Sequence, residues 1–506
     1  MTAMDLDELL HYGTAAPRHR PWPRATVTTS IWNEAIAGLA EGAWQLLGLW
    51  GEPACIHMAL LEEAKGTIGV ITLDCPERRY PSVGLHHVPA LRLERAICDL
   101  YGLEAEGTLD PRPWLDHGNW DVRYPLAARP EPAATRKNYM FLPVEGAGVH
   151  QVPVGPVHAG IIEPGHFRIT ANGETVVRLE TRFGYVHKGI EGLMAGATLA
   201  SGARFAARTS GDSTVAYGLA FARAVEAALG VEAPARAAWL RALMAEIERL
   251  ANHLGDFGAI CNDASFALML AHCGVLREKV LRVAHKAFGH RLMRDQIEPG
   301  GVTRDIDNEG IAAIRALVSD IRARFPALVE LYDNTASLQD RTVTTGTVKA
   351  DLVRQFAAGG FVGRAGSRAF DARRNLAYPP YERLDFEVPV LEAGDVNARV
   401  WIRIREIEQS LALVTQLLDG MPQGEVRIDL PVAGAACEGM TLVEGFRGDI
   451  LVWLRLNEDN SIARCHFRDP SQFQWPLVEA AIEDNIVADF PLCNKSFNCS
   501  YSGHDL

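Results

Sequence analysis

The chain has 506 residues, of which 48% are hydrophobic and 22% charged, a composition typical of folded globular proteins. Its 50 basic and 63 acidic side chains give a net charge of −13, which argues against nucleic acid as the main partner, because neutralising phosphates requires a basic surface. No uncharged apolar run reaches the roughly 18 residues of a spanning helix, and the acidic start does not resemble a signal peptide. We expect a cytoplasmic or peripheral membrane protein.

The first part of the chain, residues 1–127, predicts a small α+β domain. Cys55–Leu60 and Thr67–Leu73 have the composition of strands, and Leu91–Tyr101 predicts a helix that ends at Gly102. A Pro- and Ala-rich segment without apolar periodicity follows, AARPEPAATRK, which is typical of an exposed connection. We place the linker at residues 128–149.

The second part, residues 150–506, predicts a large and mainly α-helical bundle with β additions. Apolar side chains spaced by three and four residues mark long helices with one buried face: Leu240, Leu243, Ile247, Leu250 and Leu254; Ile311, Ile314, Leu317, Val318 and Ile321; Ile404, Ile407, Leu411, Val414 and Leu418. We expect Gly420 to be the C-cap of the last of these helices. The residues after it return to strand-like runs such as Ile450–Leu456. The fold class is α+β.

Nine cysteines are scattered along the chain, an odd number without any CxxC pair: Cys55, Cys75, Cys98, Cys261, Cys273, Cys437, Cys465, Cys493 and Cys499. This pattern argues against a disulfide framework, a zinc ribbon or an iron–sulfur site carried by this chain alone. We expect buried, reduced thiols.

Two sets of short motifs follow one another along the chain. The first set is PERRYPS (76–82), ERAICDLYG (94–102), DPR (110–112) and YPL (124–126). The second set is GPVH (155–158), GYVHKGIE (184–191), EIERLANHL (246–254), GGV (300–302), DRTV (340–343), DARR (371–374) and EGFRGD (444–449). The first set resembles the small hydrophilic, NuoC-like subunit of respiratory complex I. The second resembles the NuoD-like subunit and the large subunit of membrane-bound, formate hydrogenlyase-type (group 4) nickel–iron hydrogenases.

The metal ligands of those hydrogenases are four cysteines in two CxxC pairs, because soft thiolates suit nickel and iron. In this chain the first pair aligns with Ser210 and Ser213, with Asp212 between them, and the second pair, after an Asp-Pro step, aligns with Ser471 and Gln474. A hydroxyl does not replace a bridging thiolate. We therefore expect no metal here and no hydrogen chemistry, and a degenerate metal or quinone cavity lined by these five residues.

The end of the chain also differs from the nickel enzymes, many of which lose a C-terminal extension next to the last metal motif. Here the chain runs on to Leu506, as in the metal-free complex I branch. Cys493, Cys499 and His504 fit no standard metal spacing, so we expect them to be packing residues of a docked tail.

The quinone headgroup site of complex I occupies the former metal cavity and uses a His and a Tyr. The aligned positions are Ile162 and a residue near Gly211, and His166 and Tyr217 lie close enough in sequence to substitute. The standard pair is therefore not evident.

Ionisable residues remain around the expected cavity, and a carboxylate–imidazole set can pass protons where burial brings the pKa values together. The resemblance gives Glu163 a proton-relay role and places Arg447 over the metal cluster. The alternative is a polar network that only joins elements, which we expect for His253, Glu248, Arg373 and the Asp340–Arg341 pair, while Arg78-Arg79 and Arg373-Arg374 would suit a docking face. The candidate catalytic set is His158, Glu163, His187, Arg447 and Asp449.

Two functions remain open. In the first, the chain is the large hydrophilic subunit of a complex I-like or hydrogenase-4-like oxidoreductase on the cytoplasmic face of the inner membrane. It would contact a NuoB-like iron–sulfur subunit and antiporter-like membrane subunits, with a quinone as candidate acceptor and no cofactor of its own, since it has no GxGxxG loop for NADH. In the second, it is a redox-inactive scaffold for an ion-translocating membrane complex. An open polar cavity favours the first, and a filled one favours the second.

Overall fold

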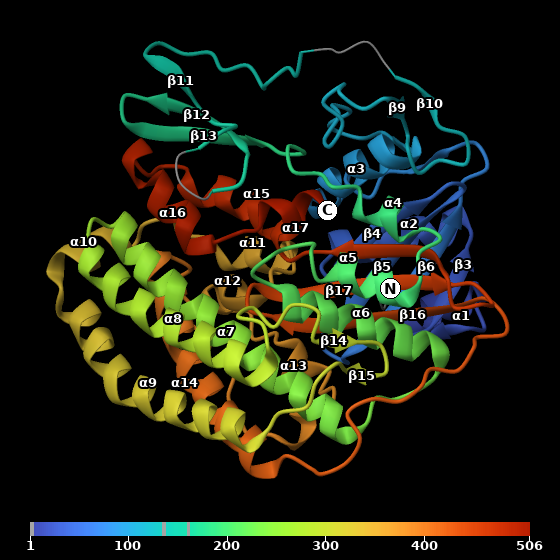
Figure 1. The fold of residues 1–506 in the computed structure, drawn as a ribbon. Helices are drawn as coiled ribbons and strands as arrows, with labels where there is room; N and C mark the ends of the chain where they lie inside the picture. The colour runs from blue at the N-terminus through green and yellow to red at the C-terminus, as the bar shows by residue number, and fades with distance from the viewer. Residues whose placement is uncertain (1–4, 134–137, 159–161) are drawn as a thin grey trace.

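The computed structural model describes residues 5–133, 138–158 and 162–506. Its N-terminal part is a five-stranded sheet with the order β1-β3-β6-β5-β4, partly covered by helices (Figure 1). The strands predicted at Cys55–Leu60 and Thr67–Leu73 are confirmed, each slightly longer than expected. The elements of this part are α1 (Leu6–His11), β1 (Thr14–Ala15), β2 (His19–Arg20), β3 (Arg24–Val27), α2 (Thr29–Ala40), β4 (Gln45–Glu52), β5 (Cys55–Glu62), β6 (Thr67–Asp74), β7 (Arg79–Pro81), α3 (Leu91–Tyr101), β8 (Glu104–Glu106), β9 (Val122–Arg123) and β10 (Glu131–Pro132).

The helix α3 has the bounds that the sequence predicts. It ends because Gly102 adopts a left-handed conformation, with φ of 67°, and its N–H donates to the carbonyl of Cys98. Glycine is favoured at this position because it has no Cβ to clash there.

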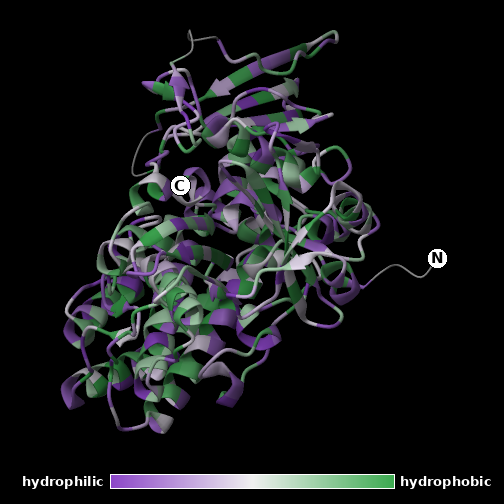
Figure 2. Ribbon diagram, turned by 90° about the vertical axis from the view of Figure 1, so that its right-hand side faces the viewer, coloured by the Kyte–Doolittle hydropathy of each residue, from purple (hydrophilic) through white to green (hydrophobic). Residues whose placement is uncertain are grey.

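A helical bundle forms the lower left of Figure 1, where α7, α8, α9 and α14 lie side by side. The three helices predicted from apolar spacing are confirmed as α7, α9 and α14. The helices from here to the second sheet are α4 (Ile190–Met194), α5 (Leu199–Ala206), α6 (Thr214–Leu229), α7 (Ala235–Asp263), α8 (Ala267–Phe288), α9 (Asn308–Asn334), α10 (Ala336–Thr342), α11 (Ala350–Gln355), α12 (Gly360–Ala365), α13 (Ala372–Asn375) and α14 (Val396–Gly420). In the lower part of Figure 2 the helices carry both hydrophobic and hydrophilic residues, as expected for helices with one buried face.

The expectation for Gly420 is wrong. It is the last residue of α14, and Met421 is the cap. Gly420 packs against a ring instead: a Cβ at this position would lie 2.6 Å from Trp239 of α7.

A second sheet, with the order β18-β17-β16-β2, lies between α6 and the N-terminal sheet. Its strands β16 (Cys437–Gly445), β17 (Gly448–Leu456) and β18 (Ile462–Arg468) pair antiparallel, and β2 adds to β16 in parallel. The strand predicted at Ile450–Leu456 is confirmed. The chain then turns helical, against expectation, in α15 (Ser471–Ile482), α16 (Phe490–Phe497) and α17 (Tyr501–Asp505). These helices are short and buried, so they show no clear amphipathic period.

A third sheet stands at the top of Figure 1, and the expected site residues His158 and Glu163 lie between its first two strands. It consists of β11 (Val149–Val154), β12 (His166–Asn172) and β13 (Thr175–Arg182), all antiparallel. A two-stranded hairpin of β14 (Ile297–Glu298) and β15 (Gly301–Val302) lies near α6.

One buried apolar cluster spans the two parts of the chain, while most other apolar residues of the N-terminal part form a cluster of their own. Leu47, Trp50, Leu61 and Val70 of the N-terminal sheet belong to the same buried cluster as the helices of the bundle. Ion pairs reinforce the contact, because Arg455 of β17 pairs with Glu52 at 2.8 Å. The division at residues 128–149 stays a prediction. No helix within the described ranges combines the length and the apolarity that crossing a membrane requires.

Candidate functional site

Ser210, Ser213, Ser471 and Gln474, which we call the four former ligand positions, are buried and are linked by hydrogen bonds through Ser500 and Arg447. Ser210 and Ser213 lie in the turn before α6, and Ser471 and Gln474 lie in the first turn of α15. All four are at most 3% exposed. The hydroxyls of Ser210 and Ser471 both contact Ser500: Ser210 Oγ lies 2.9 Å from Ser500 Oγ, and Ser471 Oγ accepts from the Ser500 N–H at 2.8 Å. Ser500 therefore links the former ligand pair before α6 to the pair at the start of α15.

Asp212 and Arg447 form the electrostatic centre of this site. Arg447 donates to both carboxylate oxygens of Asp212, at 2.7 and 2.6 Å, and to Ser213 Oγ at 3.1 Å. Burial disfavours the charged form of Asp212, but the guanidinium outweighs burial and lowers the pKa of Asp212 to about 2. The same contact holds the pKa of Arg447 above its usual value despite its burial. Bidentate geometry of this kind is strong and directional.

The C-terminal segment from Asn498 to Leu506, which we call the tail, passes across the site. Besides Ser500, its backbone accepts from Arg447 through the carbonyl of Asn498 and donates to Glu163 Oε2 from Ser502 at 3.0 Å. The docked tail that the sequence predicts is thus present.

Further along the tail, Asp505 is held by the GYVHKGIE motif. Its carboxylate accepts from the N–H groups of Gly184 and Val186, at 2.8 and 3.1 Å. His187 Nδ1 lies 2.8 Å from the Asp505 carbonyl, to which it donates. His187 and Glu163, both in the predicted catalytic set, therefore contact the tail and not each other.

Two other members of that set have separate partners. His158 Nε2 donates to the carbonyl of Gly165, at 2.8 Å, within its own loop. The Asp449 carboxylate pairs with Arg468. Of the predicted catalytic set, Arg447 is hydrogen-bonded to two of the former ligand positions: it donates to Ser213 Oγ, and its carbonyl accepts from Gln474.

The candidates for a quinone pair have other partners. Ile162 is 53% exposed. Tyr217 is fully buried and donates to Asp469 Oδ2 at 2.6 Å, while His166 lies 3.3 Å from the Gly155 carbonyl. The Tyr217–Asp469 bond, which sequence reasoning missed, ties α6 to the Asp-Pro step before α15.

Glu248 and His253, which we expected to connect elements of the fold, connect α7 to α6 and to α14. Glu248 accepts from the N–H groups of Val215 and Ala216, at 2.7 and 3.1 Å, and so caps α6. Burial raises the pKa of Glu248 to about 8, although these donors lower it. His253 lies 2.7 Å from Glu406 of α14.

Arg341 and Arg373 form structural salt bridges, as expected. Arg341 pairs with Asp489 at 3.1 Å. Arg373 is 3% exposed and is held by Asp371 and Glu246, so the alternative expectation that it belongs to a docking face is wrong.

The cysteines of the tail region do not converge with His504. Cys493 and Cys499 are buried, Cys499 Sγ lies 3.8 Å from Gln474 Oε1, and His504 packs against Phe183 with ring centroids 4.9 Å apart. The pKa of the Cys493 thiol is raised by burial to about 11, which favours the inert, protonated form.

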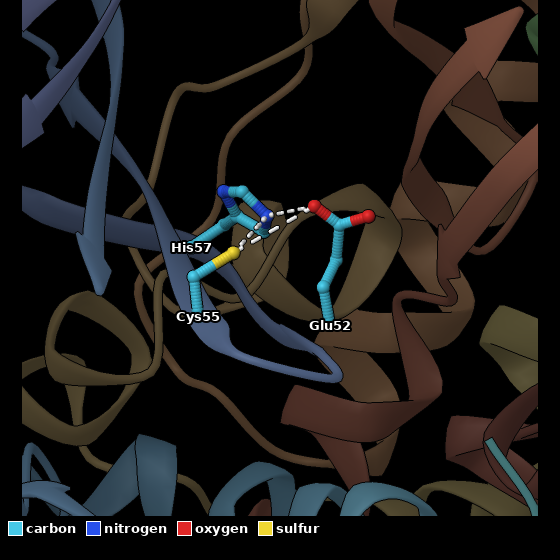
Figure 3. Close-up of side chains that lie close together, drawn as sticks. All are labelled: Glu52, Cys55 and His57. Carbon is cyan, nitrogen blue, oxygen red and sulfur yellow. Dashed lines mark hydrogen bonds and ion pairs between the residues drawn. The ribbon is translucent and has the colours of Figure 1, made fainter. Parts of the chain in front are cut away.

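Sequence reasoning missed one group with metal-ligand chemistry: Glu52, Cys55 and His57 at the β4–β5 turn (Figure 3). Their ligand atoms lie 3.0 to 3.7 Å apart. However, Arg455 donates to both oxygens of Glu52, at 2.9 and 2.8 Å. A guanidinium at this distance repels a cation, so we assign the group to the ion-pair network between the two sheets.

The donors of the former metal site do not fit nickel. Three hydroxyls and an amide are hard, neutral donors, and two of the hydroxyls are already engaged by Ser500. Tail residues such as Ser500 could have been suspected from the density of small polar side chains in the segment CNKSFNCSYS.

A family described as the respiratory-chain NADH dehydrogenase 49 Kd subunit matches residues 265–435. Hydrogenase-4 component G of Escherichia coli is 30% identical over 442 residues, 86% of this chain and 77% of that protein. Formate hydrogenlyase subunit 5 of the same organism is 29% identical over 460 residues, 88% of this chain and 81% of that protein.

The C/D subunit of NADH-quinone oxidoreductase from Phocaeicola vulgatus is 26% identical over 460 residues, 85% of this chain and 88% of that protein. The chain therefore belongs to the family of large subunits shared by NADH-quinone oxidoreductases and these hydrogenases. It lacks the ligand cysteines of the nickel enzymes.

Proposed function

We propose that this chain is the large hydrophilic subunit of a membrane-associated, complex I-like or hydrogenase-4-like oxidoreductase without hydrogen chemistry. Its relatives are subunits of NADH-quinone oxidoreductase and hydrogenase assemblies. The proposal that the chain has no hydrogen chemistry rests on one observation. Ser500 contacts Ser210 and Ser471, so that the chain's own tail occupies the former metal site.

The first test is the nickel content of the purified chain. Because none of the four former ligand positions provides a thiolate, we expect far less than one nickel per chain by inductively coupled plasma mass spectrometry. A content near one nickel per chain would overturn the proposal.

The partners that we propose are a NuoB-like iron–sulfur subunit and antiporter-like membrane subunits, on the cytoplasmic face of the inner membrane. The chain would supply a docking surface and a set of ionisable groups, and the partner would supply the cluster. The test is to tag the chain, extract native membranes gently and identify the proteins that co-purify by mass spectrometry. Recovery of membrane subunits without an iron–sulfur partner would leave no route for electrons.

A quinone-like acceptor at the former metal site requires space that the tail occupies in this structure. The contacts of Ser500 with Ser210 and Ser471 therefore also support a second candidate function, a redox-inactive scaffold or coupling subunit whose polar groups hold the assembly together. If electrons do reach this site, Glu163, which contacts the tail at Ser502, is the expected proton relay.

The two candidates are separated by Glu163→Gln in the native complex. The amide keeps an oxygen that can accept from the Ser502 N–H but cannot relay a proton. Slower acceptor reduction or ion translocation with an unchanged set of co-purifying proteins supports the redox role, while unchanged rates for both reactions remove Glu163 from the mechanism and favour the scaffold.

A further inference from the structure

A cavity of about 660 Å³ lies toward the C-terminal end of α6, and we call it the α6–α7 cavity. Its walls are the second half of α6, the first two turns of α7, Arg20 of β2 and the loop 378–383. A helix rises about 1.5 Å per residue, so Arg223 lies about 15 Å along α6 from Ser213 at the former metal site. None of the four former ligand positions lines this cavity. Its volume is in the range of small-molecule sites.

Arg223 is a half-buried cation in the wall of this cavity. Its guanidinium forms no ion pair and no hydrogen bond within the described ranges, and it lies over the ring of Tyr378, 4.8 Å from the ring centre. Burial lowers the pKa of Arg223, and the nearby carboxylate of Glu226, which Arg241 already binds at 2.6 Å, does not offset this. A partly buried charge without a counterion is unfavourable, and a bound anion would supply that counterion.

Arg20 adds a second guanidinium to the same wall. It lies beside the turn after α6, where a Cβ added at Gly230 would meet Arg20 Nη1. Among the residues that the structure describes, Arg20 has no carboxylate partner. The lining residues Arg20, Glu232 and Pro379 are exposed, so a small molecule can reach the cavity from solvent. Guanidinium groups bind carboxylates through paired hydrogen bonds.

The charges of the wall favour a ligand with a single negative charge. Four arginines and three glutamates line the cavity. Two of the arginines are each paired with a glutamate, Arg241 with Glu226 at 2.6 Å and Arg383 with Glu382 at 3.6 Å. The other three charged residues have no ion-pair partner in the described part of the chain, and together they leave one positive charge in excess. These three are Arg20, Arg223 and Glu232.

The remainder of the wall is mainly apolar. Val231 and Trp239 are half-buried there, and Leu219 and Pro380 complete this surface. An apolar group of the ligand would remove these side chains from water, which is favourable. An inorganic ion would leave this surface uncovered.

We propose that the α6–α7 cavity binds a small organic anion with one carboxylate and an apolar group. The carboxylate would pair with Arg223 and Arg20, and the apolar group would contact Trp239. The inference concerns binding alone, so it does not depend on the proposed function or on chemistry at the former metal site.

The test is isothermal titration calorimetry of the purified full-length chain at pH 7.5 with octanoate, which joins a carboxylate to an alkyl chain. Acetate, which lacks the alkyl chain, and 1-octanol, which lacks the charge, are titrated in parallel. We expect octanoate to saturate one site per chain and both other compounds to bind at least tenfold more weakly.

Two variants locate the site. Arg223→Gln removes the charge but keeps a long polar side chain that helices tolerate, and it should weaken octanoate binding at least tenfold. Arg20→Gln changes an exposed side chain and should also weaken binding, so it tests the site even if Arg223→Gln does not fold. Arg277→Gln is the matched control, because Arg277 is also a half-buried helical arginine but lies on α8, outside this cavity. The melting temperature of each variant establishes that it folds.

Saturable octanoate binding that survives in Arg277→Gln but is weakened in Arg223→Gln and Arg20→Gln supports the proposal. It is overturned if octanoate does not saturate a site, if acetate or 1-octanol binds as tightly, or if folded Arg223→Gln or Arg20→Gln keeps the native affinity. The titration is repeated on the complex purified from native membranes. Loss of binding there would identify the cavity as a contact with a partner subunit and would also overturn the proposal.

Discussion

At the scale of residues, a salt bridge and hydrogen bonds hold the candidate site together. Arg447 binds both oxygens of Asp212, and Ser500 is hydrogen-bonded to Ser210 and Ser471. Removing one partner of a buried ion pair destabilises a protein by more than the net stability that the intact pair contributes, because the other charge is left uncompensated.

Asp212→Asn is therefore expected to destabilise the chain at pH 7. A fully buried pair would lose about 3–5 kcal/mol, but the Asp212 side chain is 36% exposed and Arg447 5%, so we expect about 2–3 kcal/mol. Urea unfolding measures this difference. The control is Asp419→Asn in the pair with Arg315, where both side chains are exposed, with a change within about 0.5 kcal/mol. Equal losses of stability in Asp212→Asn and Asp419→Asn would contradict the stabilising role of the Asp212–Arg447 pair.

Glu248 makes stability depend on pH in the opposite sense from Asp212. Its pKa of about 8 in the fold lies above the unfolded value near 4.3. Its contribution is therefore fully present below about pH 4 and is lost as pH rises toward 8, because the unfolded chain ionises first.

Glu248→Gln should flatten this decline. The amide stays neutral and still accepts one of the two N–H groups at the start of α6. The free energy of unfolding measured from pH 5 to 8.5 should fall less in Glu248→Gln than in the native chain. Parallel curves would contradict the prediction, and the exposed Glu309→Gln should leave the native slope unchanged.

At the scale of elements, long helices pack closely where small residues allow it. Gly420 ends α14 against Trp239 of α7, and a Cβ there would lie 2.6 Å from the ring. In α8, a Cβ at Gly274 would meet nothing within 4 Å.

These two glycines form a matched pair of tests. Gly420→Ala should destabilise the chain by about 1–3 kcal/mol, because the ring must shift. Gly274→Ala should stabilise it by up to about 1 kcal/mol through helix propensity. Thermal melting of both variants shows the sign, and a stabilised Gly420→Ala would refute the packing argument.

At the scale of the whole molecule, the two parts of the chain depend on each other. Trp50 and Val70 belong to the core of the bundle, and β2 extends the second sheet by pairing with β16. Residues 150–506 alone would expose that apolar surface, and such surfaces drive aggregation.

We expect residues 150–506 expressed alone to be insoluble or to melt well below the full chain. Co-expression with residues 1–127 should restore solubility, which separates loss of the partner part from a badly chosen boundary. A soluble fragment with a native melting temperature would show that the shared apolar cluster is dispensable.

Residue types and their local spacing were enough to predict the long helices, several strands, the acidic charge and the lack of CxxC pairs. These features depend on residue type and local spacing, so they can be recognised without knowing which distant residues are in contact. The family followed from motifs in chain order. The three terminal helices escaped prediction because a buried short helix has no polar face.

The contacts at the former metal site and the position of a cavity could be learned from the folded structure but not from the sequence. Ser500 meets Ser210 across 290 positions of the chain, and a cavity of about 490 Å³ is bounded by residues as distant as Trp50 and Leu506. Nothing in local spacing encodes such contacts, because they follow from how helices and sheets pack. The sequence therefore indicated the candidate residues, and the packing of the fold determines which of them are in contact.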